Sequence, residues 1–263
     1  MVERSCEPRL VSLPTFVTDE PFGDASTVKL GEEAAHHMRV RRVDVGARVR
    51  ILDGLGARAE GVITQLAKRH AAVRVETREV IDPPAAIHLL LPVADRDRML
   101  WLAEKATELG VASWRPVTWR RSKHVTPRGE GTVFQQKARA RMVSALAQSG
   151  GAWLPAMFPD ATPAHAAAAR AEGAAVLLDA GAGPILRVIE KQWSALRAGD
   201  GARVITLAVG PEGGFEPDEL ELMRGAGFLP ASVGASVLRF ETAAVAGVSA
   251  ARALLDAAGE RAN

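Results

Sequence analysis

The sequence contains a single cysteine, Cys6, among its 263 residues. One cysteine excludes an internal disulfide and any zinc site built from several cysteines. No apolar run approaches the roughly 18 residues that suggest a membrane-spanning helix, and residues 1–10 are charged and lack the apolar core of a signal peptide. We therefore expect a soluble protein of the reducing cytoplasm, with no membrane partner and no metal.

A large net charge is also absent, since the formal charge is only +2 at pH 7, which excludes a bulk polycation. The charge is nevertheless uneven along the chain. Residues 96–141 contain eleven Lys or Arg and four Asp or Glu, whereas residues 142–263 contain nine against thirteen. This asymmetry suggests a basic face for an anionic partner. The alternative is a solvated surface of helices and loops.

Residues 13–81 have the features of a small β domain. Apolar residues alternate over 48–52 and 72–75, turn residues fill 53–56, and a short helix is expected over 31–40. Arginine pairs with phosphates and stacks on bases, so a local cluster of arginines suits RNA. A charged domain surface is the alternative. The cluster comprises Arg39, Arg41, Arg42, Arg48 and Arg50.

A linker is expected at 82–85, because its two prolines disfavour a continued helix or strand. The pattern after it is that of an α/β domain. We expect strands at 87–93, 114–119, 176–179, 204–209 and 228–233, and helices at 96–109, 134–149, 160–175, 217–225 and 243–259. The chain is therefore expected to divide into domains at 1–82 and 85–263.

Two glycine-containing loops follow the last two expected strands, which we take to be neighbours in the sheet. Open α/β sheets bind ligands in the crevice at the carboxyl ends of such strands. Gly213 and Gly214 would let a ligand approach bare backbone. No Gly-Lys-Ser/Thr follows them, so this is not a phosphate loop. Two ordinary turns between strand and helix are the alternative.

The wording of these loops is more specific than their composition. Gly210-Pro211-Glu212-Gly213-Gly214-Phe215, followed by Leu238-Arg239-Phe240-Glu241-Thr242-Ala243, resembles the RsmE family of SPOUT-class methyltransferases. Segments 36–46 and 105–111 resemble two further motifs of that family, with Arg41 where leucine is usual. The resemblance implies an N-terminal PUA-like, RNA-binding β-barrel and a C-terminal SPOUT α/β domain. A trefoil knot over about 176–258 would hold S-adenosylmethionine (SAM), and the protein would be a homodimer.

The reaction implied by this resemblance is SAM-dependent N3-methylation of a uridine in 16S ribosomal RNA of the small subunit (the m3U1498 site). Neutral uridine carries a proton on N3, and attack by N3 requires its removal. Arg239 is expected to stabilise charge on the uracil oxygens, and Glu212 to accept the proton or position the base. The structural alternatives are that Glu212 caps the following helix and that Arg239 pairs with Glu241.

The family motifs also imply which residues hold each partner. The loop at 179–183 is interpreted as the first of three cofactor loops. The residues expected to bind SAM are Leu178, Asp179, Gly210, Pro211, Glu212, Gly213, Gly214, Val233, Gly234, Val237, Leu238, Arg239 and Thr242. The residues expected to bind RNA are His37, Arg39, Arg41, Arg42, Lys105, Arg120, Arg121 and Lys123.

Gln148 and Ser149 are further candidates for the site, although Ala147 and Gly151 depart from the family's Glu-Gln-Ser-Gly-Arg. Two alternative functions stay open. One is a SPOUT methyltransferase that acts on a ribose 2′-OH or on transfer RNA. The other is a non-catalytic RNA-binding protein, against which the intact loops argue. The motif at 36–46 favours the uridine-N3 family.

Overall fold

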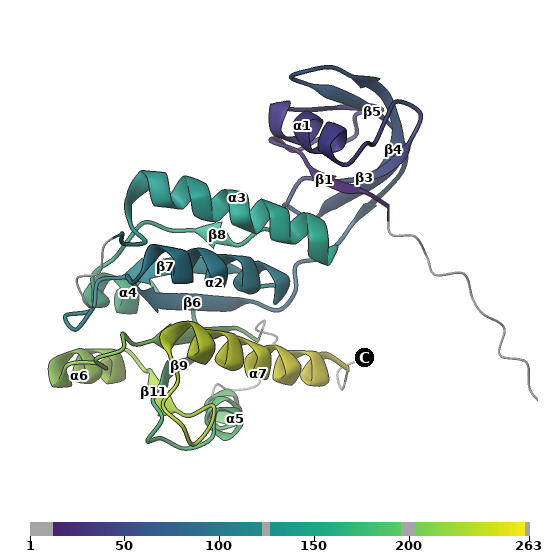
Figure 1. The fold of residues 1–263 in the computed structure, drawn as a ribbon. Helices are drawn as coiled ribbons and strands as arrows, with labels where there is room; N and C mark the ends of the chain where they lie inside the picture. Colours follow the sequence, from purple (N-terminus) through teal and green to yellow (C-terminus); the bar gives the residue numbers. More distant parts are fainter. Residues whose placement is uncertain (1–12, 123–126, 196–202, 261–263) are drawn as a thin grey trace, which may run out of the picture. The chain divides into compact units, whose positions relative to one another are not determined.

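The computed structural model describes residues 13–122, 127–195 and 203–260 (Figure 1). Cys6 and Lys123 therefore lie outside the described residues. The chain forms two compact units, Met1–Ile81 and Asp82–Asn263. Among the described helices, none is long and apolar enough to cross a membrane.

The first unit is built on a five-stranded sheet in the order β1-β3-β4-β5-β2. β1 runs parallel to β3, and the other pairs are antiparallel. The expected strand at 48–52 and the expected helix at 31–40 are confirmed. The elements are β1 (Thr15–Val17), β2 (Thr27–Leu30), α1 (Glu32–Val40), β3 (Arg48–Leu52), β4 (Ala57–Leu66) and β5 (Ala71–Val80).

Alternation along the strands explains how this unit obtains a core. In β3, Val49 and Ile51 are buried, whereas Arg48 is exposed and Arg50 only half-buried. Successive side chains of a strand point to opposite faces, so one face of the sheet is apolar. α1 covers that face with Ala35 and Met38, while its histidines remain exposed.

The second unit contains a six-stranded sheet, entirely parallel, in the order β11-β9-β10-β6-β7-β8. The expected alternation of strands and helices is confirmed. The elements are β6 (Ile87–Pro92), α2 (Arg96–Glu108), β7 (Ser113–Val117), α3 (Gly131–Ser149), β8 (Ala156–Met157), α4 (Pro163–Ala168), β9 (Ala174–Leu178), α5 (Ile185–Ala195), β10 (Ile205–Val209), α6 (Pro217–Gly225), β11 (Leu229–Ala231) and α7 (Phe240–Glu260).

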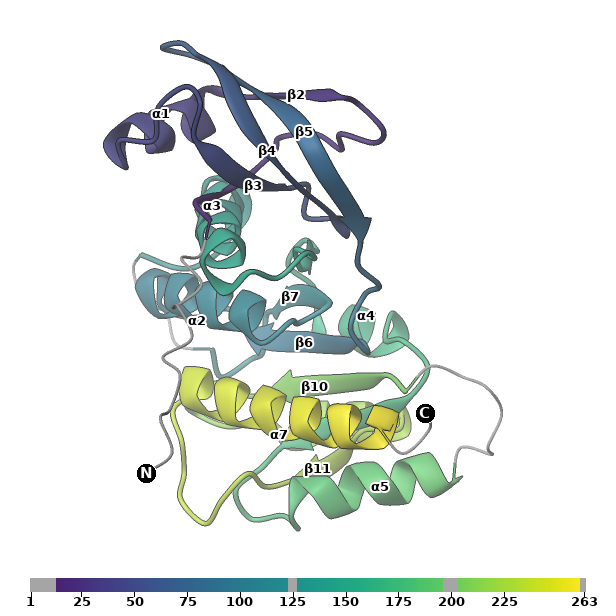
Figure 2. The same ribbon diagram turned by 90° about the vertical axis from the view of Figure 1, so that its right-hand side faces the viewer.

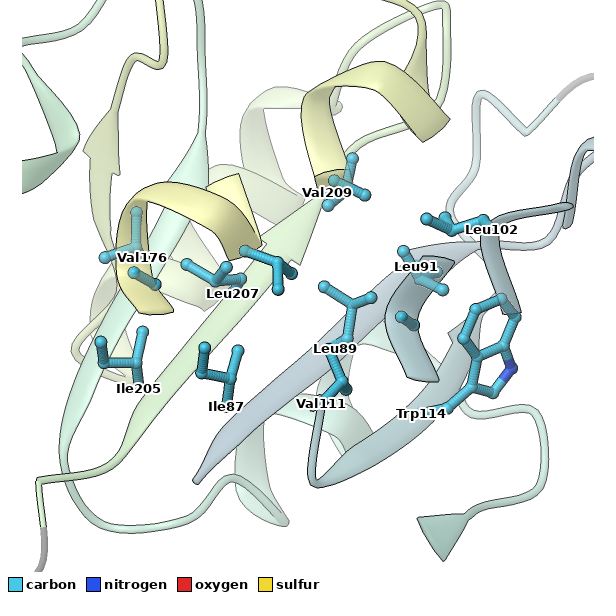
Figure 3. Packing of buried hydrophobic residues seen from close by; sticks show 14 of the residues in the cluster. Ile87, Leu89, Leu91, Leu102, Val111, Trp114, Val176, Ile205, Leu207 and Val209 are labelled. Carbon is cyan, nitrogen blue, oxygen red and sulfur yellow. The ribbon is translucent and has the colours of Figure 1, made fainter. Parts of the chain in front are cut away.

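Helices cover both faces of this sheet, so its central strands are apolar on both sides. On one face Ile87, Leu89 and Leu91 of β6 pack with α2, α3, α5 and α7 (Figure 3). On the other face Leu90 of the same strand packs in a cluster with α4 and α6. Figure 2 shows α7 lying across β10 and β6. The three layers leave the carboxyl ends of the strands as the edge where loops gather.

The structure corrects three expectations about this unit. The alanine-rich helix spans only Pro163–Ala168 instead of 160–175, because Ala174 and Ala175 enter the sheet as buried residues of β9. Tertiary pairing overrides the helix preference of alanine there. α7 begins at Phe240 rather than at 243. Finally, β10 and β11 are not neighbours, since β9 lies between them.

Candidate active site

A cleft of about 340 Å³ opens at the carboxyl ends of β9, β10 and β11. The three strands are parallel, so their following loops meet at one edge of the sheet. The loops after β9, β10 and β11 all line it, as does the first turn of α7. The cleft is within the size range of small-molecule sites, about 300–1,000 Å³. Inserting β9 between the two glycine loops thus brings a third loop into the same site.

Ten of the thirteen residues expected to bind SAM line this cleft, namely Leu178, Asp179, Gly210, Pro211, Glu212, Gly214, Val233, Gly234, Val237 and Leu238. Gly213, Arg239 and Thr242 are not among its lining residues. The sequence analysis missed Ala180, Phe215, Leu220 and Phe240, which also line it. Ala180, Phe215 and Phe240 stand inside the quoted motifs, so adjacency could have found them. Leu220 lies in α6, where an apolar residue predicts only packing.

The lining fits an adenosyl cofactor. Where a Cβ would stand at Gly214 or Gly234 there is open space, so bare backbone is accessible at both positions. Gly214 adopts a φ of +74°, which glycine favours. A Cβ at Gly213, by contrast, would lie 3.1 Å from Cβ of Arg121, so that residue faces a neighbouring loop. Apolar side chains for an adenine and carboxylates for hydroxyls or a cationic centre are both present.

Arg98, in the first turn of α2, joins two walls of the cleft. Its Nε and Nη2 donate to the two carboxylate oxygens of Glu241 at 3.0 and 2.6 Å, and its Nη1 donates to Glu212 at 2.5 Å. The guanidinium also lies 4.7 Å from the ring centroid of Phe240. Burial lowers the pKa of Arg98, but the hydrogen bonds from Glu241 and Glu212 outweigh burial and raise it.

These contacts settle both structural alternatives from the sequence. Glu241 pairs with Arg98, so the expected pairing of Arg239 with Glu241 is wrong. The helix after the first loop is capped by Glu216, whose backbone N–H donates to Glu219 at 2.9 Å, and not by Glu212. Arg239 itself is exposed and has no ion pair within the described part of the chain. It is thus the free cation of the second loop.

The basic loop after β7 is tied to the acidic start of α6. Arg120 forms an ion pair with Asp218, and its backbone N–H donates to Glu219 at 2.8 Å. Arg121 donates to Glu216 at 2.8 and 3.1 Å and to the carbonyl oxygen of Gly213 at 3.1 Å. Hydrogen bonding to these acids raises the pKa of both arginines. Much of the positive charge expected for RNA is therefore paired inside the fold.

The arginines of the first unit are divided between internal and free positions. Arg39 donates to the carbonyl oxygens of Ala67 and Lys68 at 3.0 and 2.7 Å. Arg48 and Arg50 pair with acids on β4 and β5. Arg41 and Arg42, just after α1, are exposed and have no ion pair among the residues that the structure describes, and His37 is exposed on α1. Arg41 lies at the end of a helix rather than in a strand.

Some sequence candidates lie away from the cleft. Lys105 is nine residues beyond the start of α2, about 14 Å along the helix axis, and pairs with Glu104 and Glu108. Gln148 and Ser149 end α3, which runs from the loops after β7 back toward the start of β8. Both helices lead from the carboxyl edge to the opposite edge of the sheet. None of the three residues lines the cleft.

Family models match both units of the chain. One described as RNA methyltransferase domain matches residues 82–252, and one described as RNA methyltransferase PUA domain matches residues 30–76. The expected combination of a PUA-like domain with an α/β methyltransferase domain is thereby confirmed. The trefoil knot stays a prediction.

Relatives of known identity cover nearly the whole chain. It is 31% identical over 250 residues to the ribosomal RNA small subunit methyltransferase E of Mycobacterium bovis, covering 92% of this chain and 91% of the relative. Identity with the Synechocystis protein of the same name is 27% over 258 residues, covering 97% and 82%. The structure of ribosomal RNA small subunit methyltransferase E from Neisseria gonorrhoeae bound to S-adenosyl methionine is 25% identical, with a TM-score of 0.77 and coverage of 92% and 98%.

Proposed function

We propose that this chain, which belongs to the RNA methyltransferase family together with the ribosomal RNA small subunit methyltransferases E, methylates a uridine of 16S ribosomal RNA at N3 with SAM as methyl donor. The observation that carries the proposal is the cleft at the carboxyl ends of β9, β10 and β11. It unites three loops whose sequences resemble the family's cofactor motifs. A relative with the same fold over 92% of this chain binds SAM.

The cofactor, when bound, supplies an electrophilic methyl group on a sulfonium. The loops would hold its adenosine through backbone near Gly210, Gly214 and Gly234, with Val233 and Leu238 as apolar walls. The protein must also remove the N3 proton of uridine. Glu212 lines the cleft and is held by Arg98, so its carboxylate is placed to accept that proton or to position the base.

Arg239 completes the proposed catalytic pair. It follows Leu238, a lining residue, and its side chain is exposed without an ion pair in the described part of the chain. As N3 loses its proton, negative charge develops on the uracil oxygens. A guanidinium that is not already neutralised by an internal carboxylate can stabilise that charge in the transition state.

RNA is the proposed partner of both units, with residues 1–82 as the RNA-binding domain and 85–263 as the catalytic domain. Arg41, Arg42 and Arg239 are the free cations that support this assignment best. Arg120 and Arg121 can contribute only by exchanging their internal carboxylates for phosphates. The substrate is the small ribosomal subunit RNA at the m3U1498 site, and the protein works in the cytoplasm.

Mass spectrometry of ribosomal RNA from a strain that lacks the protein tests this function. We expect 3-methyluridine to disappear from 16S RNA and to return with the wild-type gene but not with Arg239→Met. Loss of a ribose methyl group or of a transfer RNA modification instead would support the alternative SPOUT substrates. No change in any methylated nucleoside would support a non-catalytic RNA-binding protein.

A homodimer is also part of the proposal. Val248 of α7 is buried in its own unit, whereas Val245 and Leu254 are only partly buried. The alanine and glycine residues of α7 permit close packing, and a two-fold contact is the commonest arrangement for a homo-oligomer. Sedimentation at micromolar concentration tests this. A monomer with full methyl transfer would contradict it.

A further inference from the structure

We propose that Arg98 is a positioning residue that holds together two walls of the SAM cleft, the loop after β10 and the start of α7. This inference rests on the proposed function, since it concerns the affinity for the same cofactor. Arg98 does not line the large cleft itself. It acts through Glu212, Glu241 and Phe240.

The position of Arg98 is fixed from below. Asp95 is the N-cap of α2, and its carboxylate accepts hydrogen bonds from the backbone N–H groups of Asp97 and Arg98 at 3.1 and 3.0 Å. Because β6 pairs directly with β10, the first turn of α2 lies beside the loop after β10. From this fixed start the side chain reaches partners that are 114 and 143 residues away in sequence.

The contact with Glu241 is a two-toothed fork, in which Nε and Nη2 each meet one oxygen. Such paired, charge-assisted bonds fix orientation as well as distance. The side chains of Arg98 and Glu241 are 26% and 14% exposed, so water screens this pair less than a surface pair. Glu241 lies in the first turn of α7, beside Phe240, which lines the cleft.

The third N–H group, Nη1, meets Glu212 at 2.5 Å. Glu212 lines the cleft and also a hollow of about 30 Å³ next to it, which Arg98 and Phe240 help to line. One guanidinium therefore sets the positions of a carboxylate and of an aromatic ring at the same place. Without it, Glu212 and Glu241 would retain two negative charges with no cation between them.

The test compares Arg98→Met with Arg98→Lys and with Arg96→Met. Lysine keeps the charge but loses the fork, and Arg96 is a matched control on the same helical turn that pairs only with Asp97. We expect calorimetry to show a SAM Kd raised about tenfold by Arg98→Met, as for a lost charge-assisted bond. Arg98→Lys should raise it about threefold by the same reasoning, and Arg96→Met should leave it unchanged.

Other readouts separate positioning from a structural or chemical role. With SAM saturating, kcat for RNA methylation should stay within about threefold of wild type, since the effect is on cofactor binding. Two results would overturn the inference. One is a lower Tm with an unchanged SAM Kd, which is a structural role. The other is a loss of kcat with an unchanged SAM Kd, which is a role in the chemical step.

Glu241→Gln keeps the inference testable if Arg98→Met fails to fold. It removes the charge at the other end of the fork and should also raise the SAM Kd. In a folded double variant, Arg98→Met with Glu241→Gln should bind SAM no more weakly than Arg98→Met alone, because both remove one contact. Additive losses would contradict the shared contact. A wild-type protein that binds no SAM would instead refute the proposed function.

Discussion

The two glycine loops of the cleft differ in how the protein holds them. The first loop, residues 210–216, receives Arg98 at Glu212, Arg121 at Gly213 and Glu216, and a capping box at the start of α6. The second loop, residues 232–239, has far fewer ties. The Ser232 hydroxyl donates to the carbonyl oxygen of Gly234 at 2.5 Å, and the Ser232 backbone N–H donates to Gly183 at 2.7 Å.

This difference teaches which wall is ready before a ligand arrives. Ion pairs set the first loop, so its backbone already has one geometry around Gly214. Val237 in the second loop is 88% exposed although it lines the cleft, so its apolar surface is available for a ligand to cover. We expect the first loop to supply pre-organised contacts and the second to gain contacts on binding.

The largest effect should come from the free cation of the second loop. Arg239→Met is expected to lower kcat about 100-fold, the scale of losing one group that stabilises transition-state charge. The SAM Kd should stay within about twofold, because Arg239 does not line the cleft. Steady-state kinetics with ribosomal RNA, alongside calorimetry, measure both. Arg224→Met, an exposed arginine of α6, is the control. Equal losses in the two variants would remove Arg239 from the chemistry.

A change within the held loop should rank next. Gly214→Val places a branched side chain at a φ of +74°, a strain of about 1–3 kcal/mol. The loop can relieve it only by leaving the geometry that faces the cleft, so the SAM Kd should rise about tenfold or more. Gly213→Val should act less on SAM, since its side chain would meet Arg121 first. If calorimetry ranks Gly213 above Gly214, the orientation of this loop is wrong.

A smaller effect is expected for the apolar tip of the second loop. Val237→Ala removes surface that the ligand would bury, at about 0.8 kcal/mol for each buried CH₂. Partial burial should therefore raise the SAM Kd about fivefold. Val133→Ala, at an exposed valine of α3, gives the matched control. An unchanged affinity in Val237→Ala would mean that the second loop does not close on the cofactor.

The smallest effect at the cleft should come from paired arginines on the surface. Arg120→Gln combined with Arg121→Gln should change the SAM Kd less than about threefold, as exposed ion pairs contribute little. The salt dependence of RNA binding sharpens the comparison. Arg41→Gln with Arg42→Gln should reduce its slope by about two units, and the paired arginines should reduce it by less. Equal reductions would show that internal pairing does not limit RNA contact.

The sequence by itself determined the elements and most of the loops of the site. Alternating apolar residues at 48–52 predict β3, and Pro217 with the acids after it predicts the start of α6, because both signals act within a few residues. The glycine loops were predicted from their wording, and ten of the thirteen cofactor candidates line one cleft. Local sequence identifies these features since their backbone needs are local.

Only the tertiary structure decided which residues meet. Nothing near Arg98 in the sequence indicates Glu212 or Glu241, and nothing near Arg120 indicates Asp218. The place of β9 between β10 and β11, and the loss of helix at Ala174, likewise follow from strand pairing. A side chain's partner depends on the order of strands in the sheet, and that order is set by packing across more than a hundred residues rather than by neighbours in the chain.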